Sequence, residues 1–249
     1  MKLLLNALTV IGEYFMFLGK VFSVPERWKQ FFKKTIDEMY SMGVGSLPIV
    51  LIVSVIMGAV VTIQTGLQIE SSWVPKWTVG FTARTSIVME FCPTILSLLL
   101  IGNMGSRITA EIGGMRVTEQ IDALDAMGIN SASFLVLPKI VALLIVNPIL
   151  IVISMFLALL GGYLVALMGT VVAPYDYIDG ITSFFRMYDL YYALIKTVVF
   201  AFVISSIASF YGYKIEGGAL GLGKASTQAV VTSSFLVLML NLIITQIML

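Results

Sequence analysis

Long apolar stretches with little or no charge set the pattern of this 249-residue chain. A helix needs about 20 apolar residues to cross the hydrocarbon core of a bilayer. Three stretches contain no charge, and two others contain one charge each, Glu90 and Lys196. We therefore predict five membrane spans, of which the third is overlong and is expected to be tilted or broken near Pro148. The predicted spans are residues 46–69, 86–105, 134–168, 190–212 and 228–248.

The N-terminal residues have an amphipathic pattern instead. One helical face would carry Leu4, Leu8, Ile11, Phe15, Leu18 and Phe22, and the other Asn6, Glu13 and Lys20. This pattern favours a helix lying in the membrane interface. The alternative, a cleaved signal peptide, needs a more basic start and a small-residue cleavage site. A basic connector follows, suited to an anionic leaflet, with Arg27, Lys29, Lys33 and Lys34.

Lys and Arg gather on one side of the predicted spans, which gives an orientation through the positive-inside rule. With the N-terminus in the cytoplasm, the inside segments hold Lys2, Lys20, Arg27, Lys29, Lys33, Lys34, Arg107, Arg116, Lys139, Lys214 and Lys224. The outside segments hold Lys76, Arg84 and Arg186. The C-terminus is then predicted to lie outside.

Composition excludes several classes of function. Hydrophobic residues make up 59% of the chain and charged residues only 12%, which is typical of a polytopic membrane protein. The net charge of +1 favours no nucleic-acid partner. Histidine is absent and Cys92 is the only cysteine, so a Ser-His dyad, a disulfide and the usual metal sites are not expected. We expect no cofactor, no metal and no catalytic residue.

The stretch Gly218–Ala225 has the spacing of a phosphate-binding P-loop. Ala225, however, stands where a Ser or Thr hydroxyl would hold magnesium, and no buried strand precedes the stretch. We interpret it as a glycine-rich turn between the fourth and fifth spans.

The segment Glu111–Gly128 is predicted to be a short cytoplasmic helix. An apolar stripe would hold Ile112, Met115, Ile121, Leu124 and Met127. Such a helix could rest on the lipid surface. Its polar face carries more acids than bases, which favours docking to a soluble partner over binding to an anionic leaflet.

Four motifs stand out along the chain. One runs from Thr109 through Leu124 and is followed by Met127-Gly128 and Leu137-Pro138-Lys139. The others are Gly58–Gln64, Glu90–Pro93 and residues 212–230. Together they resemble the motifs of the MlaE/YrbE permeases, the membrane subunits of ABC transporters that work with MCE proteins.

This resemblance implies an all-α membrane protein with an N-terminal interfacial helix, five transmembrane helices and a short cytoplasmic coupling helix. The chain would form one domain, 1–249, with an interfacial region at 1–40, a transmembrane bundle at 46–249 and the coupling helix at 109–128. It would be a homodimer in the bacterial inner membrane, bound to a cytoplasmic ABC ATPase and a periplasmic MCE-domain protein, with phospholipid as substrate. The residues implied in ATPase coupling are Glu111, Arg116, Glu119, Asp122 and Met127. In one departure, Met89 stands where some relatives have arginine.

Polar residues in three spans are predicted to lie at a similar depth. Glu90 lies about five residues into the second predicted span, or about 7–8 Å from its outer end. Lys196 and Gln64 are placed similarly, with Gln68 nearer the surface. Pro93 removes a backbone donor nearby. One interpretation has Lys196 reaching the outer headgroups and Glu90 capping its helix.

The sharper hypothesis is a Glu90–Lys196 pair that lines a lipid cavity. The residues assigned to that cavity are Val61, Gln64, Leu67, Gln68, Glu90, Pro93 and Lys196. An ATP-driven lipid permease is the leading function. The alternative is an ATP-independent channel or secondary transporter that uses Glu90 and Lys196 as an ion relay.

Overall fold

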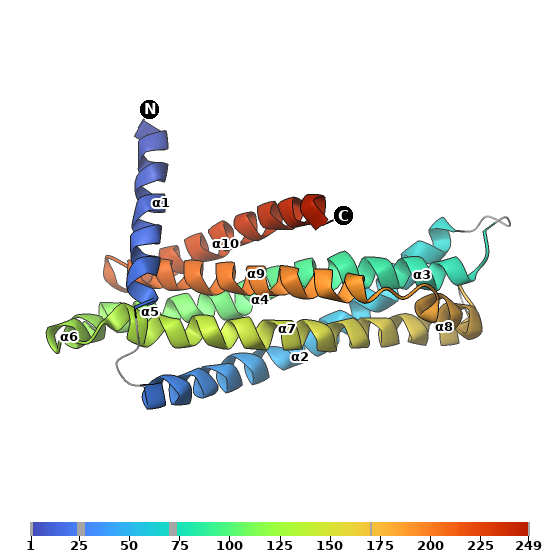
Figure 1. The fold of residues 1–249 in the computed structure, drawn as a ribbon, viewed down its shortest axis with the longest axis horizontal. Coiled ribbons are helices and arrows are strands. Elements are labelled where there is room, and N and C mark those ends of the chain that lie inside the picture. Colours follow the sequence, from blue (N-terminus) through green and yellow to red (C-terminus); the bar gives the residue numbers. More distant parts are fainter. Residues whose placement is uncertain (1, 24–27, 70–73, 170, 249) are drawn as a thin grey trace. The chain divides into compact units, whose positions relative to one another are not determined.

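The computed structural model describes residues 2–23, 28–69, 74–169 and 171–248. These residues form helices joined by short connections, and no strand occurs among them (Figure 1). The elements are α1 (Lys2–Val21), α2 (Trp28–Gln68), α3 (Trp77–Ser86), η1 (Ile87–Ile95), α4 (Leu96–Leu100), η2 (Ile101–Gly105), α5 (Ser106–Val117), α6 (Gln120–Ala126), α7 (Ser131–Leu167), α8 (Pro174–Thr182), α9 (Met187–Tyr213) and α10 (Gly218–Met248).

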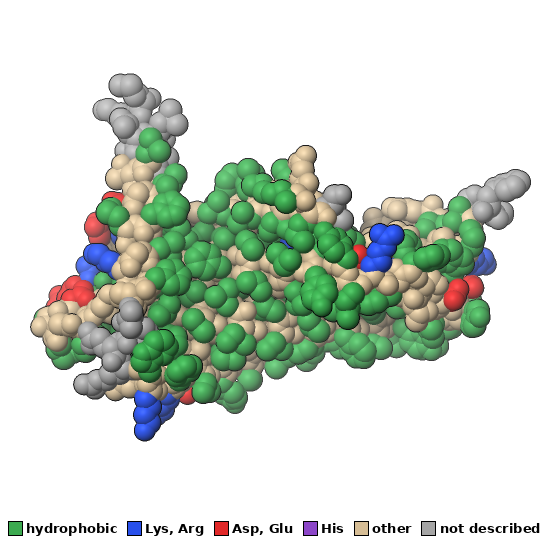
Figure 2. All heavy atoms as spheres, viewed as in Figure 1, with side chains coloured by type: hydrophobic (Ala, Val, Ile, Leu, Met, Phe, Trp, Pro, Cys, Tyr) green, Lys and Arg blue, Asp and Glu red, His purple; other side chains and the backbone are tan. Residues whose placement is uncertain are grey.

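Five continuous helical stretches of the described residues are long and apolar enough to cross a membrane. They are Trp28–Gln68, Trp77–Val117, Ser131–Leu167, Met187–Tyr213 and Leu220–Met248. Apolar side chains cover most of the face seen in Figure 2. The predicted all-α fold, with five spans and a separate N-terminal helix, is confirmed, and the chain is a multi-pass membrane protein.

The structure corrects two details of the prediction. The third span, α7, continues without a break through Pro138 and Pro148, so the expected break near Pro148 is wrong and the expected tilt stays a prediction. A proline costs a membrane helix less than a soluble one, because neighbouring helices can satisfy the freed backbone groups. The stretch Gly218–Ala225 is the first part of α10 rather than a turn. The turn lies just before it, and Gly217 and Gly218 have the positive φ values of 88° and 68°.

Two compact units make up the chain. One contains residues 1–42, 100–146 and 200–239, and the other contains residues 43–99, 147–199 and 240–249. Arg27 of the predicted basic connector lies outside the described residues, as do the side chains of residues 2–7.

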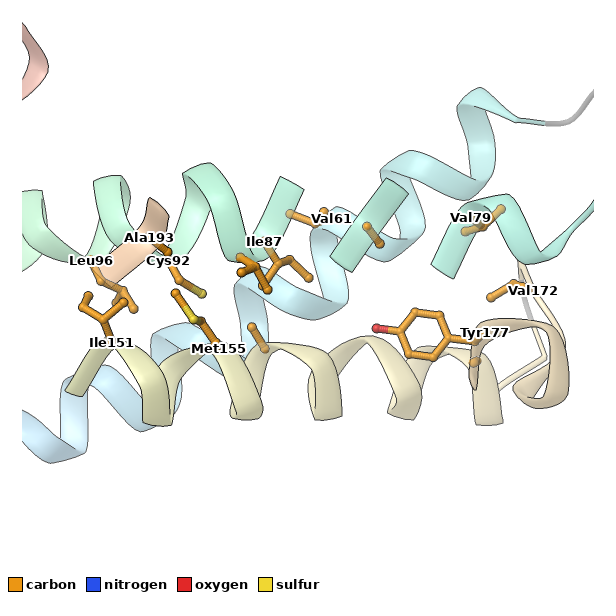
Figure 3. Packing of buried hydrophobic residues seen from close by; sticks show 14 residues of the cluster. Val61, Val79, Ile87, Cys92, Leu96, Ile151, Met155, Val172, Tyr177 and Ala193 are labelled. Carbon is orange, nitrogen blue, oxygen red and sulfur yellow. The ribbon is translucent and has the colours of Figure 1, made fainter. Parts of the chain in front are cut away.

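Glycines bring α2 and α7 close together in the second unit. A Cβ added to Gly58 would lie 1.8 Å from the carbonyl oxygen of Ala158, and one added to Gly161 would lie 2.1 Å from that of Val55. Small residues allow this approach, which is a common means of packing membrane helices. The core beside it contains Val61, Ile87, Cys92, Leu96, Ile151 and Met155 (Figure 3).

Helix α8 packs against α3 in the same unit. Arg84 is 3% exposed, and its Nη1 donates to the carbonyl oxygens of Ile181 at 2.9 Å and Ser183 at 3.0 Å. The Tyr177 hydroxyl of α8 donates to the carbonyl of Leu159 at 3.2 Å. Burial raises the pKa of the Tyr177 phenol above its usual value, so it remains a neutral donor.

In the first unit, α1 packs against the C-terminal half of α9 (Figure 1). The hydroxyls of Tyr14 and Ser206 lie 2.7 Å apart. The Phe17 ring contacts the rings of Phe210 and Tyr213, with centroid distances of 5.7 and 5.3 Å. Phe15, on the other side of α1, is 65% exposed. One face of α1 is therefore buried on protein while the other remains available to lipid.

Candidate functional site

Glu90 lies in the π-helical element η1, within the long helical stretch that begins at Trp77. At 1.5 Å per residue it is about 20 Å from that start, well beyond the first turn. A π-helical register offers each carbonyl the N–H five residues later, so the carbonyl of Met89 faces the N–H of Thr94 and the missing N–H of Pro93 is the one that would face Val88. Short π-helical segments are frequent at functional sites.

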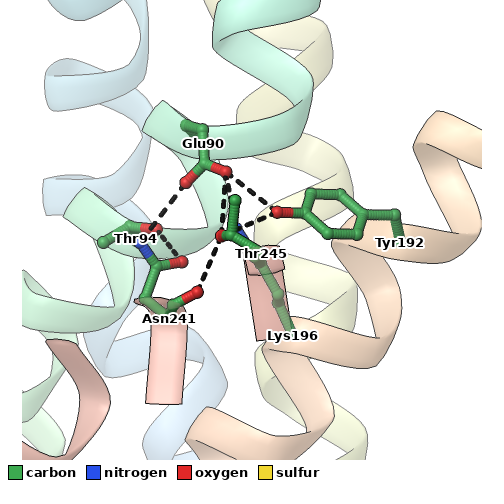
Figure 4. Close-up of polar contacts among 6 residues, drawn as sticks. All are labelled: Glu90, Thr94, Tyr192, Lys196, Asn241 and Thr245. Carbon is green, nitrogen blue, oxygen red and sulfur yellow. Dashed lines mark hydrogen bonds and ion pairs between the residues drawn. The ribbon is translucent and has the colours of Figure 1, made fainter. Parts of the chain in front are cut away.

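Four side chains from two other helices converge on the Glu90 carboxylate (Figure 4). Lys196 Nζ lies 2.7 Å from Glu90 Oε1, and the Tyr192 hydroxyl donates to the same oxygen at 2.9 Å. Asn241 Nδ2 donates to Oε2 at 3.3 Å, and Thr245 Oγ1 lies 3.4 Å from Oε1. The spans α9 and α10 therefore both contribute polar groups to one point on η1.

Further hydrogen bonds hold these partners in place. The Tyr192 hydroxyl lies 2.9 Å from Thr245 Oγ1, which itself donates to the backbone carbonyl of Asn241 at 2.7 Å. Thr94, one turn beyond Glu90, donates to Asn241 Oδ1 at 3.1 Å. We call these six residues the Glu90 cluster: Glu90, Thr94, Tyr192, Lys196, Asn241 and Thr245.

Burial differs sharply across the ion pair. The Lys196 side chain is fully buried, whereas the Glu90 side chain is 38% exposed. The contact required by the pair hypothesis is present. Lys196 does not reach outward to headgroups, and Glu90 does not cap a helix start. A lysine buried among apolar helices needs a counter-charge, and Glu90 supplies it while keeping one side open.

The other residues assigned to the cavity divide into two groups. Gln64, Leu67 and Gln68 lie on the exposed side of α2. Val61 is 5% exposed and belongs to the apolar core, where it borders a void of about 10 Å³. The structure therefore gives Val61 a packing position. Among the described residues, the hydrogen bonds of the Glu90 carboxylate go to the cluster and not to Gln64.

Sequence reasoning missed Tyr192, Asn241, Thr245 and Thr94. A signal was present, because Tyr192 precedes Lys196 by four residues and Asn241 precedes Thr245 by four. Residues four apart share one face of a helix. Pairs of polar residues at this spacing inside uncharged spans would have indicated the cluster.

The predicted coupling helix is two helices. α5 continues the second span to Val117, and α6 begins at Gln120. Between them Glu119 has a left-handed backbone with φ of 58°. Arg116 Nη1 lies 2.5 Å from Asp122 Oδ1 and so bridges the break. A single stripe from Ile112 to Met127 is therefore wrong, because the break redirects the chain.

The two halves of this segment are anchored differently. Ile112 and Ile121 are fully buried, and Met127 is 66% exposed. Glu111 Oε2 lies 2.8 Å from Lys139 Nζ, and Lys139 also pairs with Glu38 of α2. Lys139 is only 2% exposed, so one buried ammonium joins carboxylates from two other helices. The segment 106–126 has a fixed base and an exposed tip.

The chain is similar along most of its length to one known family and to several known proteins. The sequence profile of the family described as Permease MlaE matches residues 35–247. A probable ABC transporter permease protein of Rickettsia bellii is 34% identical over 238 residues, covering 95% of this chain and 91% of the relative. The intermembrane phospholipid transport system permease protein MlaE of Haemophilus influenzae is 31% identical over 235 residues, covering 94% and 89%. A probable ABC transporter permease protein of Synechocystis is 31% identical over 216 residues, covering 87% and 82%. Because the family profile matches most of the length of this chain, the chain belongs to the MlaE permease family.

Proposed function

We propose that this chain is the membrane-spanning subunit of an ATP-driven transporter that moves phospholipid between the bacterial inner membrane and a periplasmic MCE-domain protein. Family membership supports an ABC transporter permease, which works with an ATPase subunit. The observation that carries the lipid proposal is the Glu90 cluster, a polar site with one open side among apolar helices.

The cluster has the chemistry to hold a lipid headgroup. Lys196 neutralises Glu90 from the buried side. The 38% of the Glu90 side chain that stays exposed, with the Asn241 amide and Thr245 hydroxyl beside it, can exchange hydrogen bonds with a polar headgroup. Exposed apolar residues such as Leu67 would lie against acyl chains. The chain itself makes and breaks no covalent bond in this proposal.

Force would enter through the segment 106–126. We place the ATPase against α6 and the exposed Met127, with Glu111, Arg116, Glu119 and Asp122 as the polar contacts. Lys139 links Glu111 to Glu38, so a movement of α5 would be transmitted to α7 and α2. ATP binding and hydrolysis would thereby bias two arrangements of the spans.

A symmetric homodimer would complete the lipid cavity. The most apolar part of α10 is only 11% buried within one chain, and that of α2 only 28%. Such faces must meet lipid or protein, and a two-fold dimer is the commonest assembly. The distribution of Lys and Arg supports an N-terminus in the cytoplasm and a periplasmic C-terminus.

The test is transfer of a fluorescent phospholipid in proteoliposomes that contain the chain and the proteins that purify with it. We expect an ATPase subunit to co-purify and transfer to require ATP hydrolysis. Glu90→Gln should abolish transfer, and Glu216→Gln, at an exposed residue outside the cluster, should leave it unchanged. Transfer that needs no ATP and follows an ion gradient would instead assign the chain as a secondary transporter.

A further inference from the structure

A groove lies in the first unit where α1 meets the C-terminal end of α9. It has a volume of about 270 Å³ and is open to the surroundings. Glu13, Met16, Phe17 and Lys20 line it from α1, and Phe210, Tyr213 and Lys214 line it from α9 and the residue that follows. It shares no residue with the Glu90 cluster.

The spacing of the lining residues explains the shape of the groove. On α1 they recur at three- and four-residue intervals, and Phe210, Tyr213 and Lys214 do the same, so each set forms one helical face. Contacts between Phe17 and the rings of Phe210 and Tyr213 make the floor. The Asn130 side chain donates to the carbonyl of Lys20 at 3.1 Å and fixes the end of α1.

The rim of the groove is positively charged overall. Lys214 pairs with Glu13, and its Nζ lies 5.8 Å from the centre of the Phe210 ring. Lys20 is exposed and forms no ion pair among the residues that the structure describes. With Glu13 already engaged, one free ammonium remains for an anionic ligand.

The surroundings favour a lipid over a soluble anion. Leu8, Ile11, Phe15 and Met16 are each more than half exposed along α1. These side chains place the helix in the apolar edge of the bilayer. An ammonium at this level with aromatic side chains below it matches a phosphodiester with its acyl chains. A volume near 270 Å³ is slightly below the usual size of small-molecule pockets and suits a headgroup.

We propose that this groove binds the headgroup of an anionic phospholipid of the adjacent leaflet, with the phosphate between Lys20 and Lys214 and the acyl chains along Met16 and Phe17. Occupation would fasten α1 to the end of α9 from the lipid side. The proposal does not depend on the transport function, and it holds whichever leaflet faces this end of the spans.

The test uses the full-length chain in vesicles of equal parts phosphatidylglycerol and phosphatidylcholine. A photo-crosslinking benzoylphenylalanine replaces Met16 in the groove or, as the matched site, Phe15 on the outer face of α1. Mass spectrometry then identifies the lipid attached. We expect phosphatidylglycerol to be enriched at position 16 and both lipids to attach equally at position 15.

Charge variants make the result specific. Lys20→Gln should lower the phosphatidylglycerol preference about fivefold, and Lys20→Arg should retain it. Glu13→Gln removes the acid that engages Lys214 and should raise the preference, a gain that unfolding cannot produce. Lys76→Gln, at an exposed residue outside both the groove and the basic connector, is the control and should change nothing.

Three outcomes would overturn the proposal. One is equal lipid ratios at positions 15 and 16. Another is an enrichment that Lys20→Gln and Glu13→Gln do not alter. The third is attachment at position 16 to protein alone, which would assign the groove to a protein partner.

Discussion

The ammonium of Lys196 lies 2.7 Å from the carboxylate of Glu90, yet one side chain is fully buried and the other is 38% exposed. On insertion scales a charge at the centre of a span costs about 2.5–3.5 kcal/mol. The pair offsets this cost for both helices. Because their burial differs, the two residues have different roles. Lys196 compensates the charge of the Glu90 carboxylate, and Glu90 faces the open side of the cluster.

Removing each partner should therefore have unequal effects on stability. Glu90→Gln leaves a buried ammonium without a counter-charge, a loss of about 3–5 kcal/mol in comparable sites. Lys196→Met leaves a carboxylate that is partly exposed and still accepts from Tyr192 and Asn241, so we expect a smaller loss. Thermal unfolding of the detergent-solubilised chain measures both. Equal losses would show that burial does not govern the pair.

The double variant tests whether the two residues act together. Glu90→Gln with Lys196→Met removes both charges, so we expect a loss below the sum of the single losses by on the order of 1–3 kcal/mol. Lipid transfer should be lost in the single and the double variant that carry Glu90→Gln if Glu90 contacts the headgroup. Strictly additive losses of stability would argue against a coupled pair.

The Tyr192 hydroxyl provides a second test of the cluster. It donates to Glu90 Oε1 at 2.9 Å, and hydrogen bonds to charged groups contribute about 1.5–3 kcal/mol. Tyr192→Phe should therefore lower the unfolding temperature and weaken lipid transfer. Tyr191→Phe is the matched control, because Tyr191 is the preceding residue and its side chain is 59% exposed. A similar effect of both substitutions would place the loss outside the cluster.

The sequence predicted the number of spans because each apolar run is long enough to cross the hydrocarbon core of a bilayer. It did not predict their lengths, since helices such as α2 and Trp77–Val117 extend past the apolar run into polar residues. As a result Glu90 lies deeper along its helix than the predicted start at residue 86 implied.

The candidate site was predicted only in part, for a similar reason. Charged residues are conspicuous in an apolar span, so Glu90 and Lys196 were found. Neutral polar residues such as Tyr192, Asn241 and Thr245 are common in spans, and only the fold brings them to one carboxylate. The break at Glu119 was missed because a left-handed residue is rarely a glutamate.

Close packing of α2 on α7 predicts a strong effect at Gly58. In Gly58→Ala the new Cβ would lie 1.8 Å from the carbonyl oxygen of Ala158, so the helices must separate. We expect a loss of about 1–3 kcal/mol, the usual cost of overpacking. Gly12→Ala in α1 meets nothing within 4 Å and should stabilise its helix slightly. Thermal unfolding compares the two, and an unchanged Gly58→Ala would refute the close approach.

The buried ammonium of Lys139 should contribute both to the stability of the fold and to the coupling of ATP hydrolysis to lipid transfer. Lys139→Met leaves Glu38 and Glu111 without their shared cation. Because these side chains are 20% and 40% exposed, we expect a loss below the roughly 3–5 kcal/mol of a fully buried unpaired charge. Lys139→Arg retains the charge and should recover most of it. Lys224→Met, at an exposed lysine, is the control. In the transporter, Lys139→Arg should alter the ratio of lipid moved to ATP hydrolysed, because the arginine side chain is longer. An unchanged ratio would show that Lys139 contributes to folding only.

Substitutions at Glu119, which has a left-handed backbone, can test the shape of the coupling segment and its charge independently. Glycine accepts φ of 58° without the steric cost of a Cβ, so Glu119→Gly should stabilise the turn between α5 and α6 by about 1 kcal/mol. Asparagine also tolerates this conformation, so Glu119→Asn removes the charge and keeps the turn. If the carboxylate contacts the ATPase, both variants should fold well and yet bind that subunit more weakly in a pull-down assay. A continuous helix from 109 to 128 would give the opposite result for stability, because glycine would then be its least favourable residue apart from proline.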